Sequence, residues 1–136
     1  MSLSVFITTS DPLIKNQLTP FFEEHGISVT SESVASKALL KLVEENFDFF
    51  VLDLASEVES NLDLIGVVKR IKPRLPIIVL SKSTNLKTIR SLSEAGAFYC
   101  ALKPVQIPEM EKVVEIVIRF YRKEKAMEHL YKKHVP

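Results

Sequence analysis

Short apolar runs alternate with longer amphipathic stretches along most of the chain. Three of the runs, SVFIT, FFVL and IIVL, are almost wholly apolar, which is typical of strands covered on both faces of a sheet. The pattern predicts strands at Leu3–Thr8, Ile27–Thr30, Phe47–Leu52, Pro76–Leu80 and Phe98–Leu102. It predicts helices at Pro12–His25, Val34–Glu45, Leu62–Lys72, Asn85–Ala95 and Pro108–Lys133. This alternation indicates an α/β fold of three layers, with a doubly wound parallel sheet between helices.

Local signals at the helix ends agree with this reading. Asp11 before Pro12 is a good N-cap followed by proline at the first helical position. Gly26 and Gly96 stand where two helices should end. Pro20 lies inside the first helix pattern, so we expect a kink there or a gap in the backbone hydrogen bonds.

Length and composition favour one soluble domain over residues 1–136. The 136 residues suffice for a full hydrophobic core, and 46% apolar with 26% charged residues is an ordinary soluble composition. The net charge of +1 gives no overall field that would attract nucleic acid or a membrane surface. No apolar run approaches a membrane span, no signal-peptide pattern opens the chain, and Cys100 is the single cysteine. We therefore expect a cytoplasmic protein without disulfides.

Reactive side chains gather where the predicted strands end. Thr9, Ser10 and Asp11 follow the first strand, Asp53 closes the third, Ser81 and Lys82 close the fourth, and Lys103 follows the fifth. In parallel α/β sheets these ends share one edge, where ligands bind. A carboxylate there can act as a nucleophile toward phosphorus, while a hydroxyl and an ammonium bind the phosphoryl oxygens.

Over about residues 3–120 the chain resembles a receiver domain of two-component response regulators. The resemblance rests on FDFFVLDL around Asp53, LPIIVLS ending at Ser81, and AGAFYCALKP ending in Lys103-Pro104. It implies a flavodoxin-like strand order 2-1-3-4-5 and a signalling module rather than an enzyme. It further implies that Asp53 accepts the phosphoryl group, that Ser81 is the switch hydroxyl, and that Lys103 contacts the phosphoryl group and precedes a cis proline. The implied donor is a histidine kinase or a phosphotransfer protein in a phosphorelay.

The chain departs from the family at its metal site and its switch. Two adjacent acids that hold Mg²⁺ in the family align with Thr9 and Ser10, so we expect weak Mg²⁺ binding and no other cofactor. Lys82 replaces a small residue after the switch hydroxyl, and Cys100 replaces an aromatic one. We expect Ser10, Asp11, Ala55 and Lys82 to line the pocket. One hypothesis is that Lys82, alone or with Lys103, fills the space of a hydrated metal ion; its alternative is that Lys82 points into solvent.

Each candidate also has a purely structural interpretation. Asp53 and Lys103 can be a relic ion pair that holds two loops together, and Ser81 can simply hydrogen-bond the loop backbone. Asp11 can be a helix cap only. The alternative function is a pseudo-receiver, in which the same scaffold is a docking module independent of phosphorylation. A flavodoxin-like cofactor binder has little support, because the turn TTSDP lacks a glycine-rich phosphate cradle.

The last predicted helix, at residues 108–134, is longer than a sheet-covering helix needs to be. A heptad-like stripe at spacings of three, four and seven, interrupted by Glu124, comprises Val113, Val117, Phe120, Met127, Tyr131 and His134. From Arg119 onward the chain contains six Lys or Arg and two Glu, which concentrates positive charge at this end. We interpret this charge as a solvated helix face rather than a nucleic-acid patch. The stripe therefore predicts a connector to an output domain or a homodimer seam.

Overall fold

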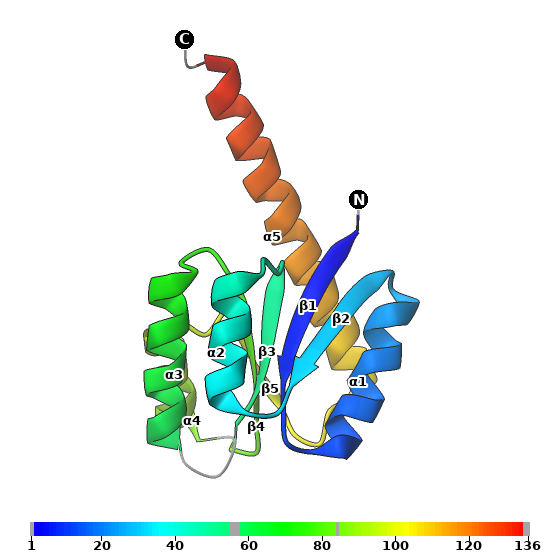
Figure 1. Ribbon diagram of the computed structural model, residues 1–136, viewed down its shortest axis with the longest axis vertical. Helices are drawn as coiled ribbons and strands as arrows, with labels where there is room; N and C mark the ends of the chain where they lie inside the picture. The colour runs from blue at the N-terminus through cyan, green and yellow to red at the C-terminus, as the bar shows by residue number, and fades with distance from the viewer. Residues whose placement is uncertain (1, 55–57, 84, 135–136) are drawn as a thin grey trace. The chain divides into compact units, whose positions relative to one another are not determined.

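The protein is described by a computed structural model that covers residues 2–54, 58–83 and 85–134, with side chains for all of these except 58–61 and 131–134. Its centre is a five-stranded parallel sheet in the order β2-β1-β3-β4-β5 (Figure 1). The strands are β1 (Leu3–Thr8), β2 (Ile27–Glu32), β3 (Phe49–Asp53), β4 (Ile77–Ser81) and β5 (Tyr99–Leu102). The predicted fold class and strand order are confirmed, with β3 in the middle of the sheet.

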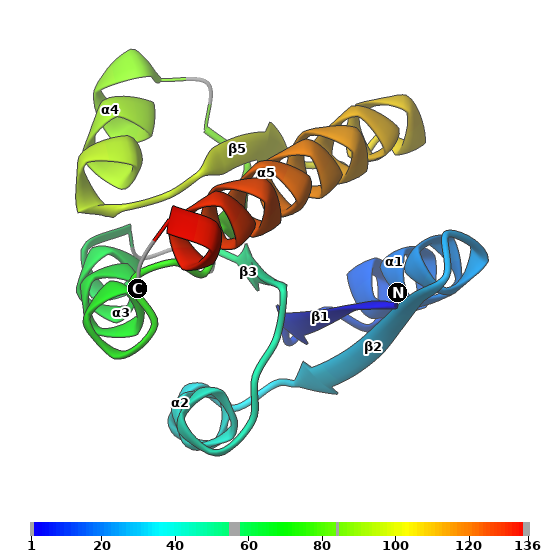
Figure 2. The same cartoon turned by 90° about the horizontal axis from the view of Figure 1, so that it is seen from above.

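Helices connect the strands in strict alternation. They are α1 (Pro12–Glu24), α2 (Ala35–Glu44), α3 (Val58–Ile71), α4 (Leu86–Ala95) and α5 (Ile107–His134). The chain divides into two compact units, Met1–Val105 with the sheet and α1 to α4, and Gln106–Pro136 with α5. In the first unit, α1 lies on one face of the sheet and α2 and α3 lie on the other (Figure 2). In the described part of the chain, no helix is long and apolar enough to cross a membrane.

The two faces of the sheet bury different side chains because strand residues alternate in direction. On one face, Phe22 of α1 packs edge-on against Phe49 of β3, with 5.5 Å between ring centroids. On the other, Phe50 of β3 belongs to a buried cluster that includes Leu42 of α2 and Ile65 of α3. β3 and β4 are therefore buried on both sides, as their nearly continuous apolar runs predict.

β1 has the predicted boundaries, and the other elements differ from the predicted ones by at most four residues at either end. β3 begins at Phe49 instead of Phe47 and extends to Asp53, which makes the carboxylate the last residue of the strand. α3 begins at Val58, four residues before the predicted Leu62, because the three residues after Val58 are polar and give no apolar periodicity. α1 continues through Pro20 as one helix. Gly26 and Gly96 follow α1 and α4 with positive φ of 73° and 123°, as expected at helix ends.

Candidate functional site

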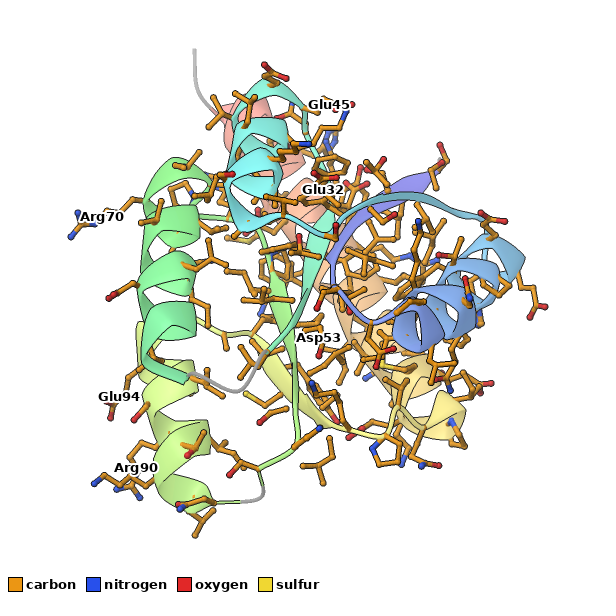
Figure 3. The ribbon with its side chains drawn as sticks, turned by 60° about the horizontal axis from the view of Figure 1, so that its bottom comes forward. Glu32, Glu45, Asp53, Arg70, Arg90 and Glu94 are labelled. Atoms are coloured by element: carbon orange, nitrogen blue, oxygen red, sulfur yellow. The ribbon has the colours of Figure 1, made fainter. Side chains whose placement is uncertain are left out.

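The site lies at the carboxyl edge of the sheet, where neighbouring strand ends come together. Thr8 of β1 pairs with Leu52 of β3, so the residues that follow them, Thr9 and Asp53, are neighbours. On the other side Asp53 pairs with Leu80 of β4, which brings Ser81 alongside. Figure 3 shows Asp53 at the end of β3 in the interior, whereas Arg90 and Glu94 project outward from α4. The parallel register thus assembles the predicted carboxylate and hydroxyl without any long loop.

Lys103 supplies the positive charge at this site. Its Nζ donates a hydrogen bond of 2.5 Å to Asp53 Oδ1 and another of 2.9 Å to the carbonyl oxygen of Leu54. The side chains of Lys103 and Asp53 are only 12% and 9% exposed. The Lys103–Pro104 peptide bond is cis, which confirms the geometry that the resemblance implies. The pair is therefore largely desolvated, and removing either charge would leave the other buried without compensation.

Thr9 holds the second oxygen of Asp53. Its Oγ1 donates a hydrogen bond of 2.7 Å to Asp53 Oδ2 and accepts one of 3.0 Å from the backbone N–H of Asp11. Thr9 is only 7% exposed. The sequence places Thr9 at this edge and in the position of a family acid, but it does not predict the hydrogen bond to Asp53. A signal was available, because a hydroxyl one residue past β1 stands beside the end of β3 in a parallel register.

Ser81 is buried at the end of β4, with 4% exposure. Its Oγ accepts a hydrogen bond of 3.1 Å from the backbone N–H of Ser83, and its carbonyl oxygen accepts one of 2.8 Å from the N–H of Lys103. The hydroxyl thus organises the loop after β4, as its structural interpretation holds. It still lines the same pocket as Asp53 and Lys103.

Two of the other predicted pocket residues lie between β1 and α1. Asp11 caps α1, since its Oδ1 accepts a hydrogen bond of 2.9 Å from the N–H of Leu13. Ser10 lines the pocket but is exposed. Ala55, which was also predicted to line the pocket, lies outside the described residues.

Lys82 lines the pocket from the loop after β4, and it is exposed. In the part of the chain that the structure describes, Lys82 forms no ion pair, so the contacts give no support to the hypothesis that it fills the space of a hydrated metal ion beside Asp53. A long cation on a loop stays in water when a neighbouring lysine already neutralises the carboxylate. The alternative, a solvated Lys82, agrees with this placement.

Cys100 has the environment of a small apolar residue. Its side chain is partly buried against the cluster beneath α2, α3 and α4. Burial raises the pKa of the Cys100 thiol and disfavours the reactive thiolate. This environment is that of a packing residue rather than of a reactive thiol.

The pocket around Asp53 has a volume of about 1020 Å³ and is lined by both charged and apolar side chains. Its lining residues are Ser10, Asp11, Leu13, Ile14, Gln17, Asp53, Leu54, Ser81, Lys82, Ser83, Lys103, Pro104 and Val105. Leu13, Ile14 and Gln17 belong to α1, and Gln17 Nε2 donates a hydrogen bond of 3.1 Å to the carbonyl oxygen of Val105. α1 contributes the apolar side chains of Leu13 and Ile14 to the lining.

Mg²⁺, which the resemblance implies at this place, does not fit the residues present. Mg²⁺ prefers an octahedral set of oxygens with one or two carboxylates free to coordinate it. Here the Asp11 carboxylate caps a helix, and Asp53, the other carboxylate that lines the pocket, is already paired with the Lys103 ammonium. Among the described residues, no group of three or more His, Cys, Asp or Glu could hold a metal ion.

A parallel 2-1-3-4-5 sheet with an aspartate, a hydroxyl and a lysine at its carboxyl edge defines a receiver-like α/β signalling domain. The family model for the response regulator receiver domain matches residues 5–115. The chain therefore belongs to the response regulator receiver domain family of two-component systems.

Relatives and solved structures agree with this assignment. The DNA-binding transcriptional regulator NtrC of Azospirillum brasilense is 31% identical over 112 residues, which are 82% of this chain and 23% of that regulator. NtrX from Brucella abortus has a TM-score of 0.84 at 20% identity, over 97% of this chain and 31% of that one. The chemotaxis protein CheY4 of Vibrio cholerae has a TM-score of 0.77 at 18% identity, over 86% of this chain and 99% of that one. The chain spans about a quarter of the length of the NtrC relatives that it matches.

Proposed function

We propose that this receiver domain takes part in a phosphorelay and accepts a phosphoryl group on Asp53. The observation that carries the proposal is the convergence of Asp53, Ser81 and Lys103 on one pocket at the edge of the sheet. A carboxylate oxygen has two acceptor positions, so Asp53 keeps lone pairs after the hydrogen bonds from Thr9 and Lys103. The carboxylate can therefore still act as a nucleophile.

The proposed step transfers the phosphoryl group from a phosphohistidine of a histidine kinase or phosphotransfer protein. One oxygen of Asp53 forms a bond to phosphorus while the P–N bond to the donor imidazole breaks, and the leaving imidazole nitrogen takes up a proton from solvent water. The Lys103 ammonium stands where it can neutralise negative charge on the phosphoryl oxygens. The Ser81 hydroxyl can donate to one of these oxygens while it keeps the hydrogen bond from Ser83.

A small phosphodonor tests this proposal without knowledge of the partner kinase. The purified chain would be incubated with acetyl phosphate or phosphoramidate, with and without Mg²⁺, and analysed by intact mass spectrometry. We expect one phosphoryl adduct that is lost in Asp53→Asn and is labile to hydroxylamine, as an acyl phosphate is.

The matched control is Asp63→Asn, which makes the same chemical change at an exposed carboxylate of α3 outside the pocket. We expect this variant to form the adduct as wild type does. An adduct that persists in Asp53→Asn, or no adduct with any donor, would contradict the proposal.

A second candidate function is the pseudo-receiver, a docking module that works without phosphorylation. It is favoured by one observation, the occupation of both Asp53 oxygens by hydrogen bonds from within the chain. The same phosphodonor experiment separates the two candidates. A pseudo-receiver stays unmodified, and its partner binds wild type and Asp53→Asn equally well.

We further propose that α5 joins the receiver to an output domain or pairs with a second copy of the chain. Met110, Val113 and Val117 in its first half are buried, whereas Met127 and Leu130 near its end are 62% and 51% exposed. The greater length of the NtrC relatives supports a connector. Sedimentation of wild type and Met127→Glu distinguishes the two, because only a homodimer seam would dissociate on substitution.

A further inference from the structure

We infer that Thr9 is a positioning residue that fixes the Asp53 carboxylate in place of a divalent cation. This role belongs to the resting state of the pocket and does not require that Asp53 is phosphorylated. The pocket residues do not fit Mg²⁺, and Thr9 is one of the two side chains that replace the acids of the family.

The charges of the pocket balance without a cation. Its charged lining residues are Asp11, Asp53, Lys82 and Lys103, two of each sign. The Asp11 carboxylate caps α1, and Lys82 is exposed, which leaves Asp53 and Lys103 as the buried pair. With acids at positions 9 and 10 the surroundings of Asp53 would carry two more negative charges. Thr9 and Ser10 remove this excess, and with it the main attraction for a divalent cation.

Thr9 is held in the geometry that this role requires. Its hydroxyl proton goes to Asp53 Oδ2, and its lone pair accepts the N–H of Asp11. The hydroxyl therefore has a defined direction, set by the start of α1. Lys103, which follows β5, fixes the other oxygen of Asp53, so the carboxylate is held from both sides.

Thr8 provides a matched control for Thr9. The two neighbouring threonines are 6% and 7% exposed, but Thr8 Oγ1 has no hydrogen-bond partner within the described part of the chain. Replacing each with isosteric valine changes the same atoms in nearly the same burial. We expect Thr9→Val to lower the melting temperature by about 5 °C, because it leaves an acceptor of a buried carboxylate unpaired. We expect Thr8→Val to leave the melting temperature unchanged or to raise it. Thr9→Ser keeps the hydroxyl and should melt closer to wild type than Thr9→Val does.

A rebuilt acid pair tests whether Thr9 replaces a divalent cation at Asp53 or only stabilises the folded state. In Thr9→Asp/Ser10→Asp we expect Mg²⁺ to raise the melting temperature, and Asp53→Asn in that background to abolish the rise. Thr9→Asp alone serves the same purpose if the double variant does not fold. The inference would be overturned if Thr8→Val and Thr9→Val changed the melting temperature equally. It would also be overturned if Mg²⁺ did not change the melting temperature of Thr9→Asp/Ser10→Asp.

Discussion

The ends of β5 and β1 both reach Asp53, but they do so with different chemistry. From the end of β5, the Lys103 ammonium binds Oδ1 and the carbonyl oxygen of Leu54. From the end of β1, the neutral Thr9 hydroxyl binds Oδ2. Loss of the ammonium would leave a desolvated negative charge uncompensated, whereas loss of the hydroxyl would leave the ion pair intact. The two strand ends should therefore differ in how much stability each contributes.

The largest effect is expected at the end of β5. Lys103→Met keeps most of the side-chain volume but removes the charge, and it should lower the free energy of unfolding by about 3 kcal/mol. Urea denaturation followed by circular dichroism measures this. Asp53→Asn/Lys103→Met should recover a large part of the loss, because neither charge is then left alone. A double variant that is less stable than Lys103→Met would argue against the proposed difference between the two strand ends.

A smaller effect is expected at the start of α1. Asp11→Ala removes the N-cap and should lower the free energy of unfolding by about 1 kcal/mol. Asp11→Asn keeps a capping side chain and should be close to wild type. If the two variants were equally destabilised, the charge of Asp11 rather than its capping hydrogen bond would be the important feature.

The smallest effect is expected at Lys82, the second lysine that lines the pocket. Lys82→Met should change the free energy of unfolding by no more than about 0.5 kcal/mol, since the side chain is exposed. The same denaturation measurement applied to Lys103→Met gives a direct contrast between the two lysines. A loss at Lys82 as large as that at Lys103 would refute the separate roles assigned to them.

The fold could be predicted from the sequence because its main signals are local. The apolar runs of β3 and β4 and the glycines after α1 and α4 each identify an element without knowledge of the others. Strand order came from the family resemblance. The helix boundary at Val58 was missed because a single apolar residue followed by three polar ones gives no hydrophobic period.

The details of the site could be predicted only in part. Asp53 and Lys103 stand at strand ends that any parallel sheet brings to one edge. Which of two lysines reaches the carboxylate depends on side-chain direction in the loops after β4 and β5, and sequence spacing does not fix that direction. The contact of Thr9 with Asp53 depends on strand register, which becomes visible only when Thr8 is seen to pair with Leu52.

The decisive measurement is the response of the wild-type chain to Mg²⁺. A ligand present at about 100 times its Kd stabilises the folded state by about 2.7 kcal/mol, which a thermal melt detects easily. We predict the same melting temperature in millimolar Mg²⁺ and in EDTA, because Lys103 already neutralises Asp53 and the Asp11 carboxylate caps α1. A clear rise in Mg²⁺ that disappears in Asp53→Asn would show instead that the carboxylate is free to bind the metal.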